Sequence, residues 1–116
     1  MSEERDLSEV FRLLHDEYAR QILTETSGER LSAKELAERC DASLSTIYRR
    51  AEALETVDLL AERTELDTDG HHYTTYEATV GRVAITFEDG TMDVDFTEDA
   101  ADRLTRVWEG IRGFDG

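Results

Sequence analysis

The fold is decided by residues 31–60, which read LSAKELAERCDASLSTIYRRAEALETVDLL. Ser32 is followed three residues later by Glu35, a capping box in which each side chain satisfies an unpaired backbone N–H group at a helix start. Ser43 is of the residue type that caps a second helix, only a short break after the first one. The segment therefore predicts two short helices, over residues 33–40 and 44–56, joined by a tight turn.

Both of these helices carry one apolar face. In the first, the residues expected to point inward are Leu36, Ala37 and Cys40. In the second, the apolar residues fall within an arc of about 80° at 100° per residue; they are Leu44, Ile47, Ala51 and Leu54. The opposite face carries Ser45, Thr46, Arg49 and Ala53, and the two flanks carry Tyr48 and Arg50.

The flanking sequence adds another helix before this segment and strands after it. Apolar residues recur every three or four positions from Leu7 to Ile22, which predicts one helix over about residues 8–26. After Leu60 the period changes to two, and residues 60–66 and 72–79 alternate around a turn at residues 67–70. These two runs predict a β-hairpin.

A second hairpin is centred on the two-residue loop Asp89-Gly90. Its expected pairs are Phe87 with Met92, Ile85 with Val94, and Val83 with Phe96, which puts all six apolar side chains on one face. Thr97 would then cap a last helix. The apolar stripe of that helix is Ala100, Leu104, Val107, Trp108 and Ile111.

Three helices followed by a β-hairpin describe a winged helix-turn-helix within an α+β fold. We expect this DNA-binding region to occupy residues 1–80. Residues 81–116 would form the second hairpin and the C-terminal helix, which are the expected dimerisation elements. With 116 residues in total, the chain is expected to form one compact domain.

The charge of the chain is strongly acidic but unevenly distributed. Thirteen Lys+Arg stand against 28 Asp+Glu, which gives a net charge of −15, and lysine occurs only once, at Lys34. Carboxylates spread over a surface in multimolar salt hold hydrated inorganic cations, and their repulsion is screened within ~3 Å. The composition therefore predicts a halophilic protein with inorganic cations on its acidic surface.

Residues 42–51 contain two arginines and no acid, and we call them the acid-free segment. A helix that reads the major groove needs polar and basic side chains on its solvent face. The residues in this segment expected to contact DNA are Ser43, Ser45, Thr46, Tyr48, Arg49 and Arg50. Ser32 and Lys34, at the start of the preceding helix, could hold a backbone phosphate.

The pattern S-x-S-T-I-x-R at residues 43–49, followed by Leu59-Leu60, resembles the recognition helix of the ArsR/MarR-like winged-helix transcription regulators. Small haloarchaeal members look most similar. The resemblance implies a sequence-specific regulator that binds double-stranded DNA, with the wing residues Arg63, His71 and His72 touching the duplex. In that family a glycine often precedes the leucine that opens the wing, whereas Val57-Asp58 fills the bend here. The paired cysteines of metal-sensing members are absent, so thiolate metal sensing does not carry over.

Reading a palindromic site requires a dimer. Related regulators often dimerise through terminal helices, so we expect a homodimer. Its contact residues would be Leu104, Val107, Trp108 and Ile111 in the last helix, with Val10 and Phe11 in the first.

Several other classes of function find no support in the sequence. It contains no G-x-x-x-x-G-K-[ST], G-x-G-x-x-G or H-E-x-x-H motif, so we expect neither an enzyme nor a cofactor or metal site. No apolar run approaches the ~18–20 residues of a membrane helix, and the first residues do not resemble a signal peptide, so we expect a cytoplasmic protein. Two alternatives stay open: an acidic winged-helix module that binds the transcription machinery, and a ligand- or metal-responsive sensor.

Overall fold

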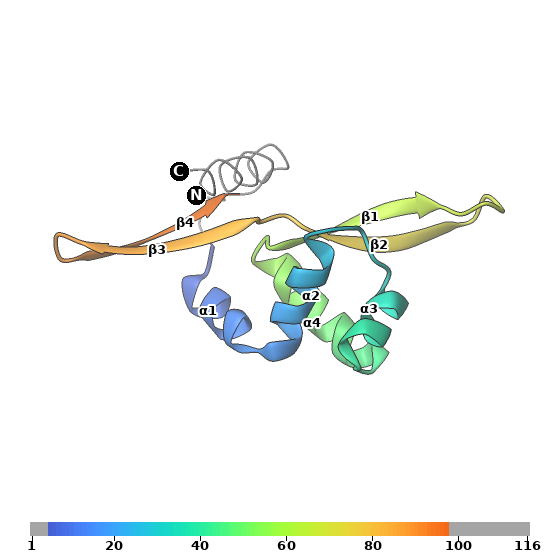
Figure 1. The fold of residues 1–116 in the computed structure, drawn as a ribbon, viewed down its shortest axis with the longest axis horizontal. Coiled ribbons are helices and arrows are strands. Elements are labelled where there is room, and N and C mark those ends of the chain that lie inside the picture. The colour runs from blue at the N-terminus through green and yellow to red at the C-terminus, as the bar shows by residue number, and fades with distance from the viewer. Residues whose placement is uncertain (1–4, 98–116) are drawn as a thin grey trace, which may run out of the picture. The chain divides into compact units, whose positions relative to one another are not determined.

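The computed structural model describes residues 5–97. The chain divides into two units, Met1–Ala78 and Thr79–Gly116. The first unit contains four helices and a hairpin, and the described part of the second contains one hairpin (Figure 1). This is the predicted α+β fold with a winged helix-turn-helix. The expected C-terminal helix, with Leu104, Val107, Trp108 and Ile111, lies outside the described residues, and a single compact domain stays a prediction.

The single helix expected over residues 8–26 is wrong, because the structure has two helices there. Helix α1 spans Leu7–His15 and α2 spans Glu17–Thr26. Asp16 between them has an extended backbone, and its carboxylate accepts a hydrogen bond from the Ala19 N–H at 2.8 Å. Asp16 thus caps α2 and interrupts the helix, although the apolar spacing continues unbroken through it.

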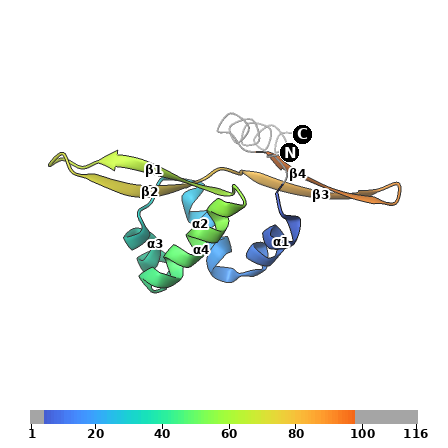
Figure 2. The same ribbon diagram turned by 180° about the vertical axis from the view of Figure 1, so that it is seen from behind.

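Helices α3 (Ala33–Cys40) and α4 (Leu44–Thr56) have the predicted bounds. The capping box is present, with the Ser32 N–H donating to Glu35 at 2.8 Å, and Ser43 caps α4. The two helices pack against each other (Figure 1 and Figure 2). The inward placement expected for Leu44 is wrong, because its side chain is 46% exposed at the first position of α4.

The wing is the antiparallel pair β1 (Leu60–Leu66) and β2 (His72–Ala78). At its root, Leu31 and Tyr76 exchange two backbone hydrogen bonds, of 3.1 and 2.7 Å, which tie the α2–α3 loop to β2. The bend before the wing places Asp58 at φ 61°, the left-handed conformation that a glycine adopts most easily. Asp58 therefore adopts, at this bend, a backbone conformation that favours glycine.

The core of the first unit is drawn from all four helices and the wing root. Its largest fully buried side chains include Ile22, Leu31, Leu36, Ile47, Leu54 and Leu59. Cys40 is buried as well, as expected for a cysteine on the inner face of α3. None of the helices within residues 5–97 has the length and hydropathy of a membrane span.

In the second unit, β3 (Arg82–Glu88) pairs with β4 (Thr91–Thr97) in the predicted register. Asp89 and Gly90 both have positive φ, at 55° and 80°, as a type I′ turn requires. The apolar side chains share one face, yet Ile85, Phe87 and Met92 are all exposed, Phe87 to 74%. The described part of this unit thus presents an apolar surface to solvent.

Candidate nucleic-acid interface

The exposed side of α4 begins with a group of hydroxyls. The Ser43 hydroxyl lies 3.2 Å from that of Ser45 and donates to Thr46 at 3.0 Å. Ser45 is exposed and Thr46 half-buried, so this polar group borders solvent at the start of the helix. Hydroxyls in this position can both donate to and accept from base edges.

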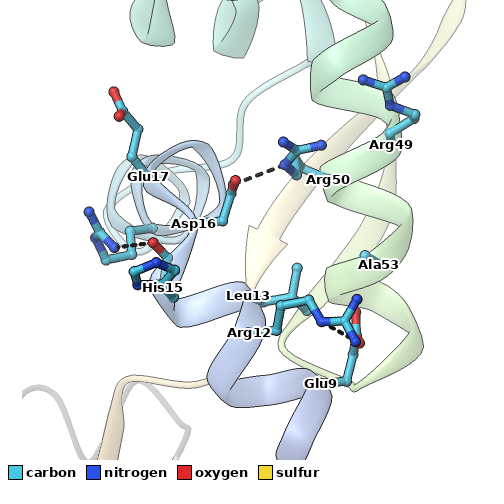
Figure 3. A pocket seen from close by; sticks show the side chains of 10 residues that line it. Glu9, Arg12, Leu13, His15, Asp16, Glu17, Arg49, Arg50 and Ala53 are labelled. Atoms are coloured by element: carbon cyan, nitrogen blue, oxygen red, sulfur yellow. Dashed lines mark hydrogen bonds and ion pairs between the residues drawn. The ribbon is translucent and has the colours of Figure 1, made fainter.

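Arg49 and Arg50 are adjacent in the sequence but diverge in space (Figure 3). The Arg50 Nε donates to the Asp16 carboxylate at 2.9 Å, while Arg49 is exposed and has no ion pair within the part of the chain described. Burial by itself would raise the pKa of Asp16, but the hydrogen bonds from Arg50 and the Ala19 amide outweigh it and lower that pKa. Arg50 therefore fixes α4 against the start of α2, and Arg49 keeps its donors available.

A groove of about 310 Å³ runs between α4, the start of α3 and β2. It brings together three residues expected to contact DNA, namely Ser32, Lys34 and Tyr48. Its remaining lining includes Leu44 and Tyr73, which the sequence analysis did not assign to the site. Tyr73 could have been found from its place next to the predicted wing histidines. Exposed Lys34 has no ion pair among the described residues.

Tyr76 lies deeper in the same groove and is buried. Burial, together with the nearby carboxylates of Glu62 and Glu55, raises the pKa of Tyr76 to about 12. Its hydroxyl therefore stays protonated and can act as a hydrogen-bond donor at neutral pH.

The wing is less basic than the sequence suggested. The Arg63 Nε donates to the Glu77 carboxylate at 2.9 Å, so the charge of this arginine is compensated within the wing. His71 and His72 are exposed at the tip, where the His71 Nδ1 lies 3.8 Å from Asp67. The possible ligand atoms of Asp67, Asp69 and His71 lie within 4.8 Å of one another, an arrangement that is common at exposed acidic turns without an ion.

The two dimer residues expected in the first helix differ in burial. Val10 is fully buried in the core of the first unit, so its expected contact with a partner chain is incompatible with its position. Phe11 is half-buried and keeps part of its side chain accessible. The spacing of three and four residues in α1 places both neighbours on the apolar side of the helix and does not say which of them is fully buried.

The comparison with known families agrees with this geometry. Residues 13–63 match a helix-turn-helix domain. The matched segment contains α2, α3, α4 and the first half of β1, which includes the exposed face of α4. The match supports a DNA-binding regulator of the winged-helix type, and domains of this kind are typically non-enzymatic. No curated protein matches the sequence.

Proposed function

We propose that this protein is a sequence-specific transcription regulator that binds double-stranded DNA as a homodimer in a high-salt cytoplasm. We assign it to the haloarchaeal ArsR/MarR-like regulators by resemblance. The single observation that carries the proposal is Arg49, an exposed arginine on α4 whose guanidinium has no ion pair among the described residues. In a chain of net charge −15, an arginine on the exposed face of this helix without a carboxylate partner favours a contact with DNA.

Base reading would be centred on the first half of α4. An arginine can donate two hydrogen bonds to O6 and N7 of guanine in the major groove. The adjacent Ser45 and Thr46 hydroxyls would contact neighbouring base edges or phosphates. Lys34 and the N–H groups at the start of α3 would hold the DNA backbone on the Tyr48 side of the helix.

Dimerisation is supported by the exposed apolar face of β3 and β4. A two-stranded hairpin by itself is marginally stable in water, so an apolar face that exposes Ile85, Phe87 and Met92 calls for a cover. A second copy of this chain would supply that cover and would pair two reading helices for a palindromic site. The apolar residues of the last segment, including Leu104 and Trp108, would join this interface.

The proposal is tested by selecting preferred duplexes from a random pool in molar KCl, followed by fluorescence polarisation with the selected and a scrambled duplex. We expect Arg49→Ala to weaken binding to the selected duplex by ~5- to 150-fold, the equivalent of one bidentate base contact. Arg82→Ala, an exposed arginine on β3, is the matched control and should bind like the parent protein. Absence of any preferred duplex for the parent protein would overturn the proposal.

The acidic surface favours one second candidate, a winged-helix module that binds a protein of the transcription machinery. Arg30, Arg39, Arg50 and Arg63 all form ion pairs with carboxylates of the chain itself, which leaves few free cations for DNA among the described residues. This candidate predicts that the parent protein shows no sequence preference in the selection above. It also predicts a basic partner, because the exposed surface is predominantly negative.

A further inference from the structure

A second cavity, of about 550 Å³, lies between α1, the start of α2 and the middle of α4 (Figure 3). Four arginines and one histidine line it: Arg12, Arg20, Arg49, Arg50 and His15. The chain has twelve arginines in total, so one third of them gather around one opening. Such a concentration is unexpected in a chain with more than twice as many acids as basic residues.

The charge around this cavity is positive even after its own acids are considered. Three carboxylates line it, those of Glu9, Asp16 and Glu17, against four guanidinium groups. Asp16 is already bound to Arg50, and Glu9 lies 3.5 Å from Arg12. The local surplus of cationic groups therefore remains after these ion pairs are formed.

Two of the arginines keep their charge uncompensated. Arg20 donates at 2.9 Å to the main-chain carbonyls of Leu14 and His15, which positions its guanidinium without neutralising it. Arg49 has no ion pair among the described residues. A guanidinium group without a carboxylate partner suits an oxyanion, which accepts charge-assisted hydrogen bonds from it.

The cavity and the Lys34 groove lie on different sides of the reading helix. Tyr48 lines the Lys34 groove and Ala53 the arginine cavity, and at 100° per residue they are about 140° apart around α4. A helix in the major groove is bordered by the two backbones of the duplex, ~12 Å apart. Phosphates of one strand would therefore reach Lys34, and phosphates of the other would reach the cavity.

We propose that the arginine cavity binds a phosphate group of the DNA backbone, held by Arg12 and Arg20 beside the reading helix. This inference rests on the proposed function and extends it to residues on α1 and α2. Arg49, which borders both the cavity and the reading face, would then be oriented by a neighbouring phosphate as well as by a base. The contact carries no sequence information, since every nucleotide presents the same phosphate.

The test compares Arg12→Gln and Arg20→Gln with the parent protein, after circular dichroism has shown that each variant is folded. We expect each variant to weaken the selected and the scrambled duplex equally, by ~3- to 10-fold, and to reduce the slope of log K against log salt by about one. Arg82→Gln removes the same charge outside the cavity and should leave both measures unchanged. Arg12 is the cleaner position, because its side chain is 79% exposed and, among the described residues, its ion pair is with Glu9 of the same helix.

The outcomes separate this inference from the proposed function. If Arg49→Ala loses the preferred duplex while both cavity variants bind like the parent protein, the phosphate assignment is wrong and the regulator stands. If the parent protein binds no duplex, both are wrong. Titration with inorganic phosphate at constant ionic strength, followed by the NMR signals of His15, distinguishes the source of the phosphate. Saturation in the low millimolar range that is lost in Arg12→Gln would indicate a small free phosphate ligand and overturn the assignment to the DNA backbone.

Discussion

Glu55, in the last turn of α4, offers a sharp test of how the reading helix is joined to the wing. Its half-buried carboxyl group is hydrogen-bonded to Glu62 of β1. Burial first, and then this hydrogen bond and the charge of Glu62, raise the pKa of Glu55 from 4.5 to about 7. The carboxyl group of Glu55 therefore keeps its proton to a higher pH than an exposed glutamate does.

The raised pKa of Glu55 sets the sign with which the free energy of unfolding depends on pH. Well below pH 4.5 Glu55 is protonated in both the folded and the unfolded chain, so the full stabilisation is present. As the pH rises towards about 7, the unfolded chain loses this proton more readily than the folded one, and the free energy of unfolding falls. The raised pKa corresponds to at most ~3 kcal/mol, and partial solvent exposure reduces this to ~1–2 kcal/mol.

Glu55→Gln removes the ionisation and keeps a group that can donate to Glu62. We expect this variant to unfold with the same free energy as the parent protein near pH 4.5 and to be more stable by ~1–2 kcal/mol at pH 8. Urea unfolding at fixed KCl, followed by far-ultraviolet circular dichroism from pH 4.5 to 8, measures the difference. Glu62→Gln should weaken the pH dependence only in part, because the burial of Glu55 remains, whereas Glu38→Gln, at an exposed carboxylate on α3, should leave it unchanged. A stability difference between Glu55→Gln and the parent protein that is constant over this pH range would refute the reasoning.

Three further predictions test the core, the second hairpin and the acidic surface. Leu36→Ala should lower the free energy of unfolding by ~2–5 kcal/mol, because Leu36 is fully buried. Leu66→Ala, at a residue that is 63% exposed, should change this free energy little. Equal losses for the two variants in urea unfolding would contradict the prediction. Gly90→Ala should destabilise the β3–β4 hairpin by ~1–2 kcal/mol, because φ is +80° at this residue and a side chain is strained in that conformation. Gly28→Ala is the control and should be nearly neutral, because no atom outside its chain neighbours lies within 4 Å of the added Cβ. Amide exchange of the β3 and β4 residues measures that loss, and unchanged protection would argue against the strained turn. Finally, the affinity of this protein for a DNA duplex should fall less steeply with rising KCl than the affinity of a basic repressor does. The reason is that salt also screens the repulsion between DNA and the acidic surface of the protein. A steep loss of affinity between dilute and molar KCl in polarisation titrations would contradict this prediction.

Much of the fold could be predicted because its signals are local. The capping box of α3 and the Ser43 cap of α4 depend on residues three positions apart, and the register of β3 and β4 depends on a two-residue turn and a period of two. The break at Asp16 could not be predicted in this way. Its neighbours keep the helical spacing of apolar residues, and the interruption arises from a carboxylate that caps α2 and binds Arg50, 34 residues further along the chain.

The candidate site likewise has features that depend on local sequence and features that depend on long-range contacts. The sequence by itself predicted helix α4 and proposed its acid-free segment as the DNA-contacting surface, because the signals of a helix-turn-helix and its caps lie in consecutive residues. Only the tertiary structure decided which of its cations remain available. Arg50 forms an ion pair with Asp16 and Arg63 with Glu77, whereas the charge of Arg49 is unpaired among the described residues. Arg49 and Arg50 have the same chemistry and are adjacent in the sequence. They differ because the fold brings the carboxylate of Asp16 to Arg50 and no carboxylate of the described residues to Arg49.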